Sequence, residues 1–319
     1  MSGAEARTVP TESTLLDLLL EPGRLSVVFQ PMFEVGTSRP QLFALECLIR
    51  GPKGSNVERP NILFEYVRRK RAEAAVDRAC IATALIDAAV LPGEPRLSLN
   101  VHASTLGRDP GFQSFLLDRA QEARIDPRRL VVEIVEHAPP LDVPSFRRAL
   151  TQLRDAGVAI ALDDVGLGQS NYKMILDVRP EIYKLDRYLV SGAWADPYRQ
   201  VILDSLARMV RRLEARAVAE GVENRNELVA VEAAGIDLVQ GFLLARPLSR
   251  VELLAAGYLS GRAPAVAGGW GSACSSSTTT TASSRCSETT SPGSGGTSRP
   301  APRPTPACRS PIRRPLSTR

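Results

Sequence analysis

Short apolar runs alternate with amphipathic stretches of ten to twenty residues along the first 260 residues of the chain. The runs predict strands over residues 25–33, 42–51, 96–103, 129–137, 158–165, 181–190, 215–222 and 237–245. Between most of them lie helical patterns, such as SFRRALTQLRDAG, which ends at Gly157. Strands that alternate with helices indicate βαβ units and a mainly parallel sheet. Eight strands in about 220 residues favour a (β/α)8 barrel, with a doubly wound sheet as the alternative.

The first two predicted strands are the exception to this alternation. Only about eight residues separate them, and these include Gly36 and Pro40. A parallel pair needs a crossover of a dozen or more residues, so this pair should be antiparallel. We therefore predict an α/β fold, a TIM-like (β/α)8 barrel whose first strand runs antiparallel to the others.

Polar residues interrupt the apolar runs, usually toward the C-terminal half of each predicted strand. In order along the chain they are Glu46, Asn100, Glu133, Asp163 with Asp164, Lys184, Glu220 and Gln240. In a barrel these positions converge at one mouth, where the active sites of this fold lie. Alone, Glu46 is explained as the partner of an arginine and Asn100 as a turn former. Seven strands with such residues at one rim indicate a functional site.

The adjacent carboxylates Asp163 and Asp164 repel each other and resist burial, so a cation, a basic neighbour or solvent must neutralise them. A ligand set of carboxylates and one amide, without cysteine or a suitable histidine, favours Mg²⁺ or Mn²⁺. Two ions bridged by one carboxylate are typical of two-metal phosphoester hydrolysis. Lys184 would then position or activate the attacking water. Gly166 and Gly168 allow the following loop to move.

The basic pI of about 9.1 comes from the C-terminal segment rather than from the predicted barrel. From Gly261 onward the chain has eight arginines, no lysine and one acid, so the rest of the chain is close to neutral. The pI therefore gives no reason to expect DNA or RNA binding by the barrel. The Ser/Thr/Pro/Arg-rich residues 261–319 have little to bury and are predicted to be disordered. They are either a dispensable extension or an electrostatic tether.

Cysteine usage and hydropathy predict the compartment. Three of the five cysteines lie in the C-terminal segment without metal-ligand spacing, and Cys47 and Cys80 lie in apolar contexts. No stretch approaches the roughly 20 apolar residues of a membrane span, and no secretory signal pattern is present. We expect a cytoplasmic protein without membrane contact. Its predicted parts are a flexible N-terminus over 1–14, a barrel over 15–260 and the tail.

Eight motifs then carry a resemblance to a known family. In order they are FQPMF, ALECLIRG, LSLNV, VVEIVE, ALDDVGLG, YKLDR, AEGVEN and VQGFLLARPL. Residues 15–258 resemble the EAL-type cyclic di-GMP phosphodiesterases, with these motifs in the same order and at compatible spacings. The resemblance implies hydrolysis of one phosphodiester of cyclic di-GMP to the linear dinucleotide pGpG. It also implies a homodimer, formed around the loop after the fifth strand and its helix.

The resemblance assigns a role to each matching residue. The metal ligands would be Glu46, Asn100, Glu133, Asp163, Asp164 and Glu220, with Asp163 bridging the two ions. Lys184 would contact the attacking water, and Glu46 and Glu220 would complete the catalytic set. Substrate contacts would come from Gln30, Arg50, Gln240, Glu223 and Asp186. Glu136 would support the loop after the fifth strand.

That loop departs from the family pattern, because Val165, Leu167, Gln169 and Asn171 replace a Phe, a Thr, a Tyr and a Ser. The changes would loosen the link between Glu136 and the loop, and hence the second metal. Three interpretations follow: an active phosphodiesterase, a degenerate domain that binds cyclic di-GMP or acts by protein contacts, and an unrelated barrel enzyme acting on another phosphoester.

Overall fold

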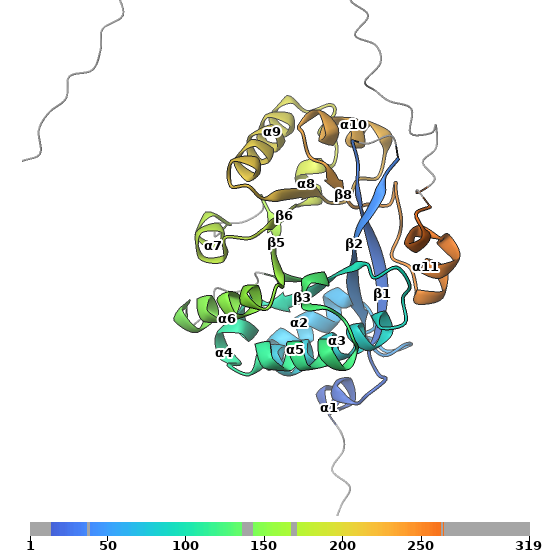
Figure 1. Ribbon diagram of the computed structural model, residues 1–319, viewed down its shortest axis with the longest axis vertical. Helices are drawn as coiled ribbons and strands as arrows, with labels where there is room; N and C mark the ends of the chain where they lie inside the picture. Colours follow the sequence, from blue (N-terminus) through green and yellow to red (C-terminus); the bar gives the residue numbers. More distant parts are fainter. Residues whose placement is uncertain (1–13, 37–38, 136–142, 167–170, 263, 265–319) are drawn as a thin grey trace, which may run out of the picture. The chain divides into compact units, whose positions relative to one another are not determined.

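The computed structural model describes residues 14–36, 39–135, 143–166, 171–262 and 264. Within these residues, eight strands form a closed barrel in sequence order, with helices packed around it (Figure 1). The strands are β1 (Ser26–Glu34), β2 (Gln41–Arg50), β3 (Arg96–His102), β4 (Leu130–Val135), β5 (Ala159–Val165), β6 (Ile182–Leu185), β7 (Arg216–Ala219) and β8 (Leu238–Val239). The helices are α1 (Leu15–Leu20), α2 (Pro60–Lys70), α3 (Glu73–Ala88), α4 (Ala103–Arg108), α5 (Phe112–Glu122), α6 (Val143–Asp155), α7 (Asn171–Val178), α8 (Arg187–Val190), α9 (Pro197–Arg212), α10 (Arg225–Ala233) and α11 (Arg250–Ala256), with 3₁₀ turns η1 (Pro127–Arg129) and η2 (Tyr258–Ser260).

The orientation of β1 confirms the predicted barrel. β1 pairs antiparallel with both β2 and β8, whereas every other neighbouring pair of strands is parallel. The connection between β1 and β2 is too short for a crossover helix, which leaves the antiparallel pairing. Because the sheet closes on itself, the doubly wound alternative is wrong.

Three of the predicted strands are too long. The strand predicted over 181–190 ends at Leu185, and Asp186 caps α8 by accepting a hydrogen bond from the backbone N–H of Tyr188. Leu189 and Val190 are buried on this short helix rather than in a strand. A short run of buried apolar residues is compatible with a strand or a helix, so the apolar pattern alone placed the end of this strand too late. β7 and β8 are likewise shorter than the runs at 215–222 and 237–245.

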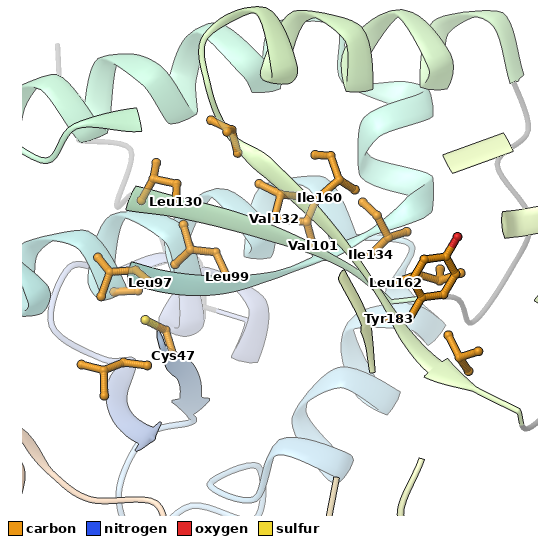
Figure 2. Close-up of a cluster of buried hydrophobic side chains, with 14 of the residues drawn as sticks. Cys47, Leu97, Leu99, Val101, Leu130, Val132, Ile134, Ile160, Leu162 and Tyr183 are labelled. Carbon is orange, nitrogen blue, oxygen red and sulfur yellow. The ribbon is translucent and has the colours of Figure 1, made fainter. Parts of the chain in front are cut away.

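Side chains of the parallel strands alternate between two apolar layers. Leu97, Leu99, Val132 and Ile160 point outward and pack with the surrounding helices (Figure 2). Inside the barrel lies a separate cluster: Met32, Ala44, Val131, Ala161, Ile182, Val218 and Leu238. This alternation follows from the two-residue period of a β-strand. The inner cluster fills the barrel, so the barrel is a packed core rather than a channel.

A polar layer lies directly above the inner apolar cluster. In the seven mutually parallel strands it lies two residues after each interior position: Glu46 after Ala44, Asn100 after Ser98, Glu133 after Val131, Asp163 after Ala161, Lys184 after Ile182, Glu220 after Val218 and Gln240 after Leu238. In β1, which runs the other way, Gln30 precedes Met32 by the same two residues. The fold therefore gathers the predicted site residues at one end of the barrel.

Several helices begin at residues whose side chains cap them, among them α9 and α10. Asp196 accepts hydrogen bonds from two backbone N–H groups at the start of α9, and Asn224 and Glu227 form a capping box at the start of α10. These caps satisfy N–H groups that have no partner within the helix. In the part of the chain that the structure describes, no helix combines the length and apolar character needed to cross a membrane.

Candidate active site

Lys184 on β6 is the centre of the polar layer. Its ammonium group lies 2.6 Å from Glu220, 3.4 Å from Asp163 and 3.5 Å from Glu46, and it also contacts Glu133. Only 2% of the side chain is exposed. Burial alone would lower the pKa of Lys184, but the four surrounding carboxylates outweigh burial and raise this pKa well above its usual value. Lys184 therefore stays protonated at neutral pH.

Glu46 on β2 is fixed from two sides. Asn100 Nδ2 donates a 3.0 Å hydrogen bond to one carboxylate oxygen, and Gln240 Nε2 donates a 2.7 Å hydrogen bond to the other. Burial acts to raise the pKa of Glu46, but the charge of Lys184 and these two amide donors lower it overall. Glu46 is therefore an ionised carboxylate of defined orientation.

Glu133 on β4 is completely buried. Ser98 donates a 2.8 Å hydrogen bond to one of its oxygens, and Lys184 contacts the other. Burial and the nearby charge of Glu46 raise the pKa of Glu133 well above its usual range. Ser98 was not among the residues predicted for the site, although its position two residues before Asn100 places it on the same interior face.

A local irregularity explains how the adjacent Asp163 and Asp164 both reach the site. Neighbouring residues of a regular strand point to opposite faces. Here the register between β5 and β6 shifts between Leu162 and Val165, and Asp164 has a φ of +52°. A bulge with one residue in the left-handed region redirects a side chain in this way. Lys184 pairs with Asp163, whereas Asp164 is exposed to solvent.

Two further carboxylates of the site have raised pKa values. Partial burial and the charges of Asp163 and Asp186 raise the pKa of Asp164 to about 6. Burial, opposed by Lys184 and reinforced by Asp163 and Glu46, raises the pKa of Glu220 to about 8. In both cases burial is the largest cause of the raised pKa, and nearby negative charges add to it.

The carboxylate oxygens are grouped closely enough to bind metal ions. One group consists of Glu46, Glu133 and Glu220, and the other of Asp163, Asp164 and Glu220; within each, one oxygen per residue lies within 4.8 Å of the others. Apart from the 3.4 Å ion pair with Lys184, the buried Oδ1 of Asp163 has no hydrogen-bond partner among the described residues. An all-oxygen site of this kind fits a hard divalent cation. Glu220 belongs to both groups.

A cavity of about 480 Å³, which we call the bay, opens beside these carboxylates. It begins at Glu46, Asn100 and Asp163 and extends between β2 and the helices α2 and α3. Arg50 is half-buried in its wall. Of the other predicted substrate residues, Gln30 donates a 3.3 Å hydrogen bond to the carbonyl of Ala245, and Gln240 is 3% exposed beside Glu46.

Two further residues that were predicted to bind substrate, Asp186 and Glu223, interact with other side chains and backbone groups at the edge of the site. Asp186 caps α8 and lies close enough to Asp164 to affect its pKa. Glu223 pairs with Arg187 at 2.9 Å. Arg187 was not predicted from the sequence, since an arginine after a strand has no distinguishing pattern. Glu136, Leu167 and Gln169 lie outside the described residues.

A glycine positions the loop that carries Glu220 and Glu223. A Cβ atom on Gly241 would lie 2.1 Å from the carbonyl oxygen of Val222, so only glycine fits there. Val222 also donates a backbone hydrogen bond of 3.1 Å to Gln240 and accepts one from Leu243. This close approach keeps the loop after β7 beside the end of β8.

The family model for the EAL domain matches residues 13–247. The chain therefore belongs to the EAL domain family, as its motifs predicted, and similar solved structures share its barrel. One is Klebsiella pneumoniae BlrP1 as a manganese/cyclic di-GMP complex, which is 30% identical with a TM-score of 0.64, over 72% of this chain and 57% of that chain. A second structure of that protein, a calcium/cyclic di-GMP complex, is also similar to this chain.

The similar proteins include a phosphodiesterase and an antirepressor. Cyclic di-GMP phosphodiesterase PA2567 of Pseudomonas aeruginosa is 30% identical over 153 residues, which is 48% of this chain and 26% of that protein. Blue light- and temperature-regulated antirepressor BluF of Escherichia coli is 28% identical over 154 residues, 48% of this chain and 38% of that protein. The chain thus spans well under half the length of these relatives.

Proposed function

We propose that this chain is a metal-dependent phosphodiesterase that hydrolyses cyclic di-GMP to the linear dinucleotide pGpG. The observation that carries the proposal is the polar layer itself. Five carboxylates, an asparagine and a protonated lysine meet at the mouth of the barrel, and the bay opens directly beside them. Cyclic di-GMP phosphodiesterases among the relatives, and cyclic di-GMP in similar structures, support the choice of substrate.

Two divalent cations, Mg²⁺ or Mn²⁺, are the cofactors of this proposal. As metal ligands all five carboxylates would be ionised, and against one ammonium group they would carry an excess of four negative charges, which two divalent ions would balance. Glu46, Asn100, Glu133 and Asp163 would hold the first ion, and Asp163, Asp164 and Glu220 the second. The ions would supply Lewis-acid polarisation of the phosphodiester and charge neutralisation.

The chain's own polar groups would orient the reactants. Lys184 is protonated and fixed by carboxylates, so it can donate a hydrogen bond to the attacking water. Arg50, in the wall of the bay, would bind a phosphate. Gln240 uses its amide N–H on Glu46, and no described residue donates to its buried Oε1, which suits a contact with the nucleotide. Gln30, directly opposite Glu46 in the sheet, would make the second amide contact.

A turnover assay tests the proposal. The full chain is incubated with cyclic di-GMP in Mg²⁺, in Mn²⁺ or in excess EDTA, and the products are separated by chromatography. We expect pGpG in either metal and none in EDTA. Lys184→Met should remove turnover while leaving nucleotide binding measurable, because Lys184 acts on the water. Absence of pGpG at any metal concentration would contradict the proposal.

Cyclic di-GMP binding without efficient hydrolysis is a second candidate function. It is favoured by the exposure of Asp164 and by the residues after it that depart from the family pattern. The same assay separates the two functions. Binding of cyclic di-GMP by calorimetry with no pGpG in either metal would establish the receptor function instead.

A homodimer is part of the proposed assembly. On α7, Tyr172 is 73% exposed and Leu176 is 70% exposed, which is unusual for large apolar side chains four residues apart. Pairing through this helix would cover both. Light scattering should give the mass of a dimer for the wild type and of a monomer for Leu176→Arg. A cytoplasmic location stays a prediction from the sequence.

A further inference from the structure

The lining of the bay extends beyond the residues of the carboxylate cluster. Apolar side chains also line it, among them Ile81, Ala84, Leu99 and Phe64 of α2. The rings of Phe64 and His102 lie 5.6 Å apart at an angle of 58°. An apolar pocket whose lining includes aromatic side chains suits a nucleic-acid base, because proteins commonly bind bases by stacking them on such rings.

Two charged residues of α2, Glu65 and Arg68, also line the bay. They form an ion pair with each other, and Arg69 also donates a 2.8 Å hydrogen bond to Glu65. A carboxylate has about four lone-pair sites, so Glu65 can accept further hydrogen bonds while it stays paired. Both side chains are about 40% exposed and can adjust to a ligand.

We infer that Glu65 and Arg68 determine base specificity by binding the two edges of one guanine of the substrate. This inference rests on the proposed function. Arginine binds O6 and N7 of guanine, which are both acceptors. The Glu65 carboxylate, which only accepts hydrogen bonds, matches the N1–H and 2-amino donors of guanine. Adenine has an acceptor at N1 and a donor at its 6-amino group, so it would place like groups against both residues.

Binding of three cyclic dinucleotides tests the inference. Affinities for cyclic di-GMP, cyclic di-IMP, which lacks the 2-amino groups, and cyclic di-AMP are measured by calorimetry on the full chain. Ca²⁺ is included because it accompanies cyclic di-GMP in one similar structure. The wild type should prefer cyclic di-GMP over cyclic di-IMP by about tenfold, as expected for a hydrogen bond to a charged group. Cyclic di-AMP should bind more weakly still.

The variants identify the residues responsible. Glu65→Ala should reduce the preference for cyclic di-GMP over cyclic di-IMP to less than about threefold, and Arg68→Met should weaken discrimination against cyclic di-AMP. Arg69→Met is the matched control, because Arg69 pairs with the same Glu65 but is not part of the bay lining. It should keep the wild-type preferences.

The possible failures are distinguishable. If the wild type binds none of the three dinucleotides, the proposed function is wrong, and the inference with it. If the wild type binds cyclic di-GMP but the two bay variants keep its base preferences, only the inference is overturned. Equal binding of cyclic di-GMP and cyclic di-IMP by the wild type would also exclude Glu65 as the residue that recognises the 2-amino group.

Discussion

Gln240 and Glu46, which are 194 positions apart in the chain, are joined by a hydrogen bond of 2.7 Å from Nε2 of Gln240 to Oε2 of Glu46. The bond connects the end of β8 with β2 across β1, where the barrel closes. It orients a candidate metal ligand with a donor that is itself buried. Partners that orient metal ligands in this way affect metal affinity almost as strongly as the ligands do.

Gln240→Ala should therefore weaken Mn²⁺ binding by about tenfold or more, because Glu46 loses one of its two amide donors. Titration of Mn²⁺ by electron paramagnetic resonance measures this without substrate. Gln200→Ala, at an exposed position of α9, is the control and should leave Mn²⁺ affinity unchanged. Unaltered Mn²⁺ affinity in Gln240→Ala would show that Asn100 and Lys184 suffice to orient Glu46.

Glu46→Ala should lower hydrolysis of cyclic di-GMP by more than about a hundredfold, because it removes a charged ligand. The fold should survive, since the substitution also relieves repulsion among carboxylates. Turnover and the thermal midpoint are measured on the same preparation. Wild-type turnover in a folded Glu46→Ala variant would exclude Glu46 from the site.

Asp164→Asn should produce a protein that binds cyclic di-GMP but does not hydrolyse it. Asp164 belongs only to the second carboxylate group, so the first group, with Glu46 and Glu133, remains complete. We expect little change in nucleotide affinity by calorimetry and at least a tenfold loss of turnover at saturating Mg²⁺. If turnover recovers fully at high Mg²⁺, Asp164 only tunes metal affinity.

The metal-free protein should lose stability as the pH rises from about 4 to 8. Asp164 and Glu220 hold their protons in the folded state up to a pKa of about 6 and about 8, whereas the unfolded chain releases them near pH 4. The folded state thus binds more protons in this range, and the free energy of unfolding falls with pH. Thermal midpoints in EDTA across pH 5 to 9 measure the effect.

Glu220→Gln is the matched variant for this pH dependence, because it keeps the shape of the side chain without the ionisation. Its thermal midpoint should fall less between pH 6 and 8 than that of the wild type. Identical pH profiles for the two proteins would mean that Glu220 does not titrate in this range.

Asp77→Ala should destabilise the barrel by about 2–4 kcal/mol. Asp77 of α3 is 1% exposed, and it accepts hydrogen bonds from the backbone N–H of His102 at 3.0 Å and the hydroxyl of Thr105 at 2.6 Å. It also pairs with Nδ1 of the His102 ring at 2.8 Å. Urea unfolding measures the change, and Asp118→Ala, at an exposed position of α5, should stay within about 0.5 kcal/mol of the wild type.

The sequence by itself determined the barrel, the antiparallel first strand and the residues of the polar layer. This was achievable because a strand has a period of two, so Val131 and Glu133 must point the same way, as must Ala161 and Asp163. A barrel then brings the same end of every parallel strand to one mouth. The short connection after β1 excluded a crossover helix without any knowledge of the tertiary structure.

Only the tertiary structure decided the contacts within that layer. Lys184 and Glu133 are 51 positions apart in the chain, and Ser98 and Glu133 are 35 positions apart. The closure of the barrel and the strand register bring these residues together, and they decide which carboxylates Lys184 pairs with. The bulge that turns Asp164 toward Asp163 has no pattern in the sequence, because alternation predicts opposite faces. Residues 187–190 form a helix because Asp186 caps it there, whereas an apolar run alone is compatible with either element.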